Sequence, residues 1–163
     1  MQMSDCKFCS IAKGQGLDEE IVFENDACFV LLDKYRVTSA GAICLVISKR
    51  HFSDITELDD SISEILLTTI KKTAILSKTT FRANGVRIWQ ANGKAAGQSI
   101  FHLHFHIVPC NSVWDRLIAL FPVAFDLLVR HNIFLVNRSI SNVKRKKFAD
   151  SLRHNYEKGI VSP

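Results

Sequence analysis

Three histidines stand at alternate positions in the segment FHLHFHIVP, residues 101–109: His102, His104 and His106. Imidazole can act as a nucleophile, transfer protons near neutral pH or bind a metal ion. If the segment is a β-strand, alternate side chains point to opposite faces of the sheet, so the imidazoles share one face and the apolar residues share the other. Packing alone gives no reason for three histidines on one face, and the pattern therefore indicates a chemical site.

The segment ahead of the histidines, NGKAAGQS at residues 92–99, contains two glycines and mostly small residues. A loop of this kind lets backbone N–H groups approach an anion closely. It is not a phosphate-binding loop of the Walker type, because Gln98 follows Gly97 where that motif needs a lysine. Joined directly to three imidazoles, the loop favours chemistry on a phosphate group.

Residues 92–109 resemble the signature of the histidine triad (HIT) family of nucleotide-binding proteins, in which such a loop precedes the alternating histidines. The similarity continues upstream in CKFC (6–9), IVFENDACFVLLDKYRV (21–37) and LVISKRH (45–51), and spans about residues 5–110. It is greatest to the zinc-containing bacterial members. The resemblance implies an α+β HIT-like fold, with an antiparallel sheet of about five strands, one long helix, a short N-terminal helix and here an extra C-terminal segment.

The resemblance also implies the activity of a nucleotidyl hydrolase or transferase. Such enzymes cleave nucleoside phosphoramidates or dinucleoside polyphosphates at the α-phosphate through a covalent nucleotidyl-histidine intermediate, which divides one difficult displacement into two easier ones. His104 matches the nucleophile, whose second ring nitrogen is held as N–H by a backbone carbonyl near the first triad position. His106 matches the histidine that contacts the phosphate and the leaving group, and His102 completes the catalytic triad.

Four further residues match substrate-binding positions of the family. Asp33, at the end of an apolar segment, matches the ligand of the ribose hydroxyls. Asn92, Gln98 and Ser99 match positions that hold phosphate oxygens or lie near the leaving group. The resemblance therefore implies a purine nucleotide as the bound partner and implies no organic cofactor.

Cys6 and Cys9 form a C-x-x-C motif, which by itself could be redox-active or structurally inert. The zinc-containing bacterial members bind a zinc ion through this pair, a histidine that corresponds to His51, and the first triad histidine, His102. Two thiolates and two imidazoles make a closed tetrahedral set, which is typical of a structural zinc site. The resemblance thus implies a structural zinc ion joining the N-terminal segment to the histidine segment.

Two other functions remain open. The first is a nucleotide-binding or interaction protein with weak or vestigial activity. The second is a zinc metallohydrolase in which the triad itself holds the metal, so that His104 and His106 would both contact the ion.

The chain departs from the family pattern ahead of the segment LVISKRH. Many members have a histidine near the active site where this chain has Ala42 and Ile43, and a proline where it has Ser48. The missing histidine puts one hydrogen bond behind the active site in doubt, but not the nucleophile.

The elements that must position these residues follow from hydrophobic periodicity. Alternation, or an apolar run bounded by turn residues, predicts strands at 20–25, 28–33, 42–48, 85–91 and 100–109, the last ended by Pro109. Helical spacing predicts a long helix at 59–80, which Ser61 or one of the neighbouring aspartates could cap, and shorter helices at 5–14 and 142–156. Because strands and helices do not alternate regularly, an antiparallel sheet is favoured over a doubly wound one.

The length of 163 residues fits one domain. We assign residues 1–137 to the HIT domain and residues 138–163 to a basic helical extension. The extension holds seven of the 21 Lys and Arg residues and two of the 16 Asp and Glu residues, and so accounts for the net charge of +5. A solvated helix face explains such a run, and without interleaved aromatic residues or zinc-finger spacing nucleic-acid binding is not expected.

The N-terminal residues lack the basic and apolar character of a secretory signal, and no apolar run is long enough to cross a bilayer. We therefore expect a cytoplasmic protein without membrane contact. The odd number of cysteines, five, fits reduced thiols or metal ligands better than a disulfide framework. Proteins of this family usually dimerise through a sheet edge, and an exposed edge strand gives a physical reason to expect a homodimer.

Overall fold

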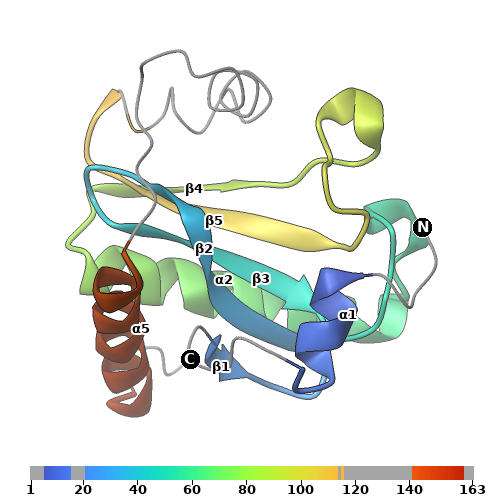
Figure 1. Cartoon of the computed structure of the whole chain (residues 1–163), viewed down its shortest axis with the longest axis horizontal. Helices are drawn as coiled ribbons and strands as arrows, with labels where there is room; N and C mark the ends of the chain where they lie inside the picture. The colour runs from blue at the N-terminus through green and yellow to red at the C-terminus, as the bar shows by residue number, and fades with distance from the viewer. Residues whose placement is uncertain (1–5, 16–20, 114, 116–140, 160–163) are drawn as a thin grey trace.

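Strands and helices of the predicted α+β type make up the computed structural model, which describes residues 6–15, 21–113, 115 and 141–159 (Figure 1). Within these residues the strands form one antiparallel sheet of five, in the order β1-β2-β3-β5-β4. The strands are β1 (Ile21–Glu24), β2 (Cys28–Val37), β3 (Ala42–Ser48), β4 (Gly85–Trp89) and β5 (His104–Cys110). The helices are α1 (Lys7–Ala12), α2 (Ser63–Thr80) and α5 (Asn142–Glu157).

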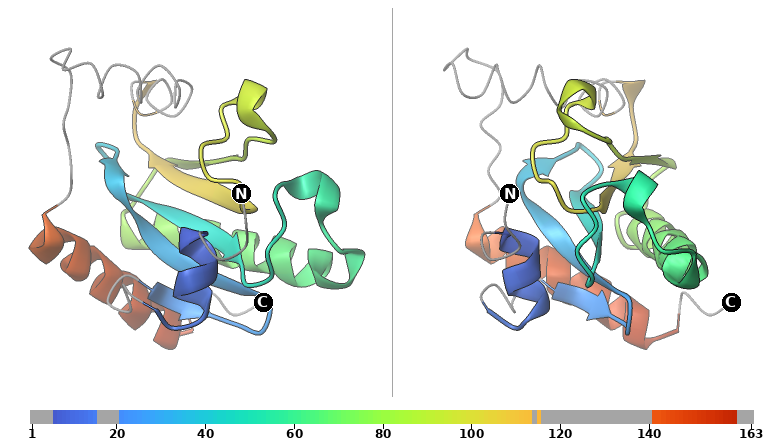
Figure 2. Two further views of the ribbon diagram at one scale, coloured as in Figure 1. Left: turned by 45° about the vertical axis from the view of Figure 1, so that its right-hand side comes forward. Right: turned by 90° about the vertical axis from the view of Figure 1, so that its right-hand side faces the viewer.

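The two faces of the sheet are covered by different helices (Figures 1 and 2). Phe8 and Ile11 of α1 pack against Leu31 and Leu45 of the sheet in one apolar cluster. The longer α2 covers the opposite face. Its first turn is preceded by a 3-10 turn, Asp60–Ile62, whose N-cap is one of the predicted aspartates, Asp59, accepting a hydrogen bond from the Ser61 amide.

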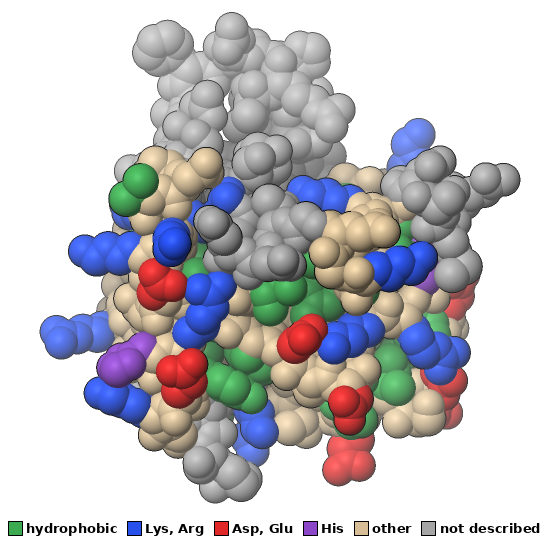
Figure 3. Space-filling view, turned by 60° about the horizontal axis from the view of Figure 1, so that its bottom comes forward, with side chains coloured by type: hydrophobic (Ala, Val, Ile, Leu, Met, Phe, Trp, Pro, Cys, Tyr) green, Lys and Arg blue, Asp and Glu red, His purple; other side chains and the backbone are tan. Residues whose placement is uncertain are grey.

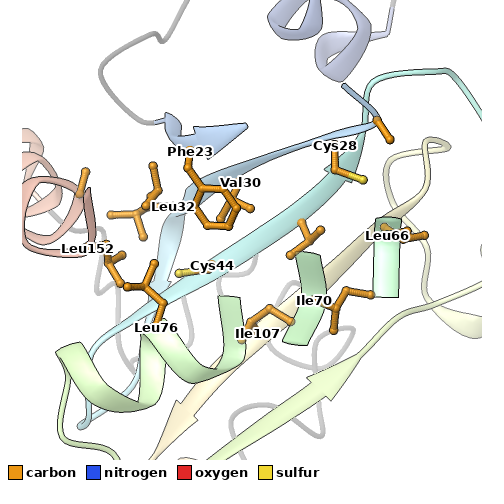
Figure 4. Close-up of a cluster of buried hydrophobic side chains, with 14 of the residues drawn as sticks. Phe23, Cys28, Val30, Leu32, Cys44, Leu66, Ile70, Leu76, Ile107 and Leu152 are labelled. Carbon is orange, nitrogen blue, oxygen red and sulfur yellow. The ribbon is translucent and has the colours of Figure 1, made fainter. Parts of the chain in front are cut away.

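The main hydrophobic core lies between the sheet and α2 (Figure 4). Strand alternation sends every second side chain to it, including Val30 and Leu32 from β2 and Ile107 from β5. Two cysteines of this face, Cys28 and Cys44, are fully buried, and burial raises the pKa of their thiols to about 11 and about 12. These thiols are therefore neutral and pack as small apolar side chains.

The basic C-terminal helix is part of this packing. Ala149 and Leu152 of α5 are fully buried and belong to the core cluster. The Arg153 guanidinium donates two hydrogen bonds to the Ile21 carbonyl, at 2.8 and 2.6 Å, and so joins α5 to β1. The predicted helix at 142–156 is confirmed, whereas the predicted domain boundary at 137–138 lies outside the described residues.

The outer side of α5 carries the exposed lysines of the KRKK sequence, Lys144, Lys146 and Lys147. On the face presented in Figure 3, Lys and Arg side chains are interspersed with Asp and Glu rather than gathered into one patch. This distribution agrees with a solvated helix face.

The predicted strand at 100–109 is wrong at both ends. Residues 101–102 form a bend, β5 begins at His104, and Pro109 lies inside the strand opposite Val86. Pro109 has no N–H to donate to a neighbouring strand. It is tolerated because the N–H and C=O of one residue point to the same side of a strand, and on this side the pairing of β5 with β3 stops before Pro109. The Pro109 carbonyl accepts a hydrogen bond from the Thr38 hydroxyl at 2.7 Å, on the side where the pairing with β3 has already ended at Ile107.

The predicted strand at 28–33 is shorter than the observed one, because β2 continues to Val37. The chain then reverses in a tight turn, in which the Thr38 amide donates to the Gly41 carbonyl at 2.9 Å. No side chain fits at Gly41, since a Cβ there would overlap the Phe81 ring.

Within the described residues, no helix is both long and apolar enough to cross a membrane. The cytoplasmic location stays a prediction.

Replacing Leu152 with alanine should lower the free energy of unfolding by about 2–5 kcal/mol, because it leaves a cavity in the core. Val143, on the same helix but 81% exposed, is the matched control, and Val143→Ala should change stability by no more than about 0.5 kcal/mol. Urea denaturation followed by circular dichroism measures both. Equal stability of the two variants would contradict the packing of α5 into the core.

Candidate functional site

The three imidazoles lie on the face of the sheet that carries α1. The apolar residues between them, Leu103 and Phe105, pack into the core on the opposite face, as the alternation predicted. His102 precedes β5 and is fully buried, His104 begins the strand and is partly buried, and His106 is 7% exposed.

His104 is oriented by one short hydrogen bond. Its Nδ1 donates to the backbone carbonyl of His102 at 2.6 Å. An imidazole that is protonated on Nδ1 carries its lone pair on Nε2, so the contact selects a nucleophilic tautomer. The Phe8 ring of α1 packs edge-on against His104, with the centroids 5.3 Å apart, and limits the positions the imidazole can take.

The ring of His102 is held from both sides. Its Nε2 lies 2.7 Å from the Ser48 carbonyl at the end of β3 and donates to it, which leaves the lone pair on Nδ1. This Nδ1 lies 3.3 Å from the Cys6 sulfur and 3.6 Å from the Cys9 sulfur. Burial lowers the pKa of His102 to about 4, so the imidazole is neutral at physiological pH, the form that binds a metal ion.

Cys6, Cys9, His51 and His102 form a compact group whose possible ligand atoms all lie within 4.8 Å of one another. Cys9 Sγ and His51 Nδ1 are 3.3 Å apart. Zinc bond lengths place neighbouring ligands of a tetrahedral site about 3.3–3.8 Å apart, so the measured contacts fit such a site. Without an ion, burial and the neighbouring Cys6 raise the pKa of the Cys9 thiol to about 11, and a coordinated metal would favour the thiolate.

His104 and His106 are not members of this group. The arrangement of the described residues therefore speaks against the metallohydrolase hypothesis, which needs both of them at the metal. Each His102 nitrogen also has a separate partner, as expected for a metal ligand whose second nitrogen is hydrogen-bonded to a carbonyl.

One side of the ligand group borders a surface hollow lined by Cys9, Ala12, Lys13, Lys49, Arg50 and His51. Two of its cations are paired, Lys49 with Glu24 at 3.0 Å and Arg50 with Asp59 at 2.8 Å. Both pairs are solvated and contribute little to stability.

Gln98 organises the loop that precedes the triad. Its Oε1 accepts a hydrogen bond from the Gly93 amide at 2.7 Å, and its Nε2 donates to the Ile100 carbonyl at 3.1 Å and to the Ser53 carbonyl. The side chain is 4% exposed, and both of its amide donors are directed at backbone carbonyls. In this structure Gln98 therefore shapes the loop, and the predicted contact with phosphate oxygens would need one of these bonds to open.

The other predicted substrate residues lie on different elements. Asn92 is exposed and accepts a hydrogen bond from the Ile55 amide at 3.0 Å, which joins the loop to the segment after β3. Ser99 is exposed at the end of the loop. Asp33 is 8% exposed on β2, two residues after Leu31, and strand alternation puts it on the α1 face with the imidazoles.

The place where many family members have a histidine is apolar here. Ala42 and Ile43 are both buried, and Ile43 packs with Val108 in a small cluster that Trp89 and Cys110 complete.

Two residues of the site were missed by sequence reasoning. Ser48 departs from the family pattern, but the hydrogen bond that its carbonyl accepts from His102 depends on where β3 ends. Trp89 stacks on His106, whereas the sequence pattern predicts for it only a place in an alternating strand. The alternation of residues 85–91 predicts that Trp89 points to one face of its strand. Only the pairing of β4 with β5 shows that His106 is its neighbour on that face.

Comparison with known proteins identifies the family of this domain. A model of the HIT domain matches residues 15–113. An uncharacterised HIT-like protein of Saccharolobus solfataricus is 38% identical over 104 residues, which are 64% of this chain and 73% of that protein. The adenosine 5′-monophosphoramidase of Candida albicans is 31% identical over 110 residues, covering 65% and 70% of the two chains. The adenylylsulfatase of Arabidopsis thaliana is 31% identical over 109 residues, covering 65% of this chain and 52% of that protein.

Solved structures share the fold. A hypothetical histidine triad nucleotide-binding protein from Sulfolobus tokodaii superposes with a TM-score of 0.72 at 27% identity, over 94% of this chain and 93% of that one. A Zn-bound histidine triad family protein from Mycobacterium smegmatis has a TM-score of 0.70 at 23% identity, over 96% of each chain, and shows the fold alone. With the domain match over residues 15–113, these similarities show that the chain belongs to the HIT family.

Proposed function

We propose that the protein is a nucleotidyl hydrolase or transferase that cleaves nucleoside phosphoramidates or dinucleoside polyphosphates at the α-phosphate. The observation that supports this most directly is the 2.6 Å hydrogen bond from His104 Nδ1 to the His102 carbonyl, which leaves the Nε2 lone pair for attack. Two relatives named as an adenosine 5′-monophosphoramidase and an adenylylsulfatase agree with chemistry at an adenylyl phosphorus.

The proposed reaction has two displacements. In the first, the His104 Nε2 lone pair forms a bond to the α-phosphorus, and the bond from phosphorus to the leaving group breaks. The Nδ1–H bond to the His102 carbonyl stabilises the positive charge that develops on the imidazole. In the second, water attacks the same phosphorus and gives up a proton, the P–N bond to His104 breaks, and the nucleoside monophosphate leaves. The proton released by water balances the one that the leaving group takes up from solvent in the first displacement.

Neighbouring residues would bind the substrate in this scheme. His106, whose ring centroid lies 5.1 Å from that of His104, would contact the phosphate and the leaving group. The loop that Gln98 organises would present backbone N–H groups and Ser99 to the developing charge, with Asn92 at its start. Asp33, on the same face of the sheet, would accept hydrogen bonds from the ribose hydroxyls of a purine nucleotide.

Intact-mass measurement after mixing with adenosine phosphoramidate should detect an adenylylated chain in the wild type. His104→Ala should abolish the adduct and lower turnover by about 10⁴-fold or more, because the attacking nitrogen is gone. His154→Ala is the matched control, since His154 is exposed on α5 and should be dispensable. An adduct that persists in His104→Ala would refute the nucleophile, whereas nucleotide binding without turnover or adduct would support the alternative of a binding protein.

We further infer that Cys6, Cys9, His51 and His102 hold a structural zinc ion. The donor set and the contacts of 3.3 to 3.6 Å support this. A closed set of four protein ligands leaves no position for substrate, so zinc would supply structural support only, tying α1 and the end of β3 to the start of β5.

Metal analysis of the purified protein should find one zinc ion per chain. Cys9→Ser should lose most of the zinc and unfold at a lower temperature, because the closed ligand set loses one of its thiolates. Cys110→Ser, which changes a half-buried cysteine outside the group, should retain the ion and the wild-type unfolding temperature. Equal zinc content in the two variants would show that the group is not the metal site.

We also propose that the protein is a homodimer joined at β4. This strand is an edge of the sheet in the described residues, its side chains are partly buried or exposed, and Ile88 is 46% exposed. The outer side of an edge strand can pair with a strand of a second copy. Sedimentation velocity should therefore give the mass of two chains, and a monomer at micromolar concentration would contradict the proposal.

A further inference from the structure

Trp89 and His106 form a face-to-face aromatic pair across two neighbouring strands. Trp89 ends β4 and lies directly opposite His106 in the pairing with β5. Their ring centroids are 3.9 Å apart and their planes differ by 1°. The whole imidazole face therefore lies flat against the indole.

The contact with Trp89 restricts rotation of the His106 ring about the terminal torsion of its side chain. The terminal torsion of a histidine side chain has a broad, roughly two-fold preference, so the ring plane needs an outside support. Rotation of the His106 ring out of its present plane would break the parallel contact with Trp89. The His104 ring also contacts the His106 ring, with the centroids 5.1 Å apart and the planes at 63°.

Trp89 is itself braced. It packs against the cluster formed by Ile43 and Val108, both of which are at most 3% exposed. The indole is therefore partly buried and supported by the sheet, and it can in turn support the imidazole.

We propose that Trp89 is a positioning residue for the reaction, acting through His106 by fixing the plane of its imidazole. This inference rests on the proposed function, since it assigns His106 to the phosphate and the leaving group. Trp89 contacts no reacting atom in this scheme. Its contribution is the alignment of the ring, and misalignment of about 1 Å in an active site can lower the rate by about 10²-fold.

Three variants separate alignment from general damage to the strand. Trp89→Leu removes the flat ring and should lower kcat for adenosine phosphoramidate by roughly 10- to 100-fold, while KM changes little. Trp89→Phe keeps an aromatic face and should retain most of the wild-type kcat. Leu67→Ala alters an exposed residue of α2, away from β4, and should leave the kinetics unchanged.

A spectroscopic measurement tests the contact without any substrate. In proton NMR of the full-length protein, the His106 ring signals, assigned by comparison with His106→Asn, should lie upfield because the indole ring current shields them. The shift should remain in Trp89→Phe, reduced in size, and disappear in Trp89→Leu. Absence of the upfield shift in the wild type would overturn the stacking.

The kinetic and spectroscopic outcomes also separate this inference from the proposed function. An active wild type with unchanged kcat in Trp89→Leu would overturn the positioning role and leave the nucleotidyl activity standing. An upfield His106 signal in a wild type without any turnover would overturn the proposed function, and with it any catalytic role for Trp89.

Discussion

The backbone at His102 is the point on which the rest of the site depends. Its carbonyl accepts the Nδ1–H of His104, and its ring is held between the Ser48 carbonyl and the sulfurs of Cys6 and Cys9. The amide of the next residue donates to the Phe52 carbonyl at 2.7 Å. Because ring and backbone are both anchored, the tautomer and direction of His104 are set by the fold and not by substrate. Such preorganisation lowers the cost of reaching a reactive geometry.

The neighbouring imidazole, His106, has an aromatic contact of its own. His104 donates a hydrogen bond from its Nδ1 to a backbone carbonyl, whereas the His106 ring stacks on Trp89. Phe8 of α1 packs against His104, and Gln98 holds the preceding loop by hydrogen bonds to the loop backbone. Hydrogen bonds and aromatic contacts thus together restrict the positions of these imidazoles. The group of Cys6, Cys9, His51 and His102 adds a further constraint where α1, the end of β3 and the start of β5 meet.

Much of the fold was predictable because it follows from local periodicity. The apolar run at 42–48 is β3, and the amphipathic spacing at 59–80 and 142–156 became α2 with its preceding turn and α5. The start of β5 was not predictable, since its alternation continues through residues that the structure bends. That bend depends on partners far away in the sequence, including Phe52 and Ser48, which local pattern does not reveal.

The sequence by itself determined the chemical types and their spacing: the alternating imidazoles, the glycine-containing loop before them and the C-x-x-C motif. These follow from residue identity, because a strand places alternate side chains on one face whatever lies next to it. Only the tertiary structure decided which partners these groups have. In the folded chain Gln98 forms hydrogen bonds with the loop backbone, the Ser48 carbonyl accepts a hydrogen bond from His102, and Trp89 stacks on His106. Each contact depends on strand register or on the packing of distant segments, and both are set by the whole core rather than by any one stretch of chain.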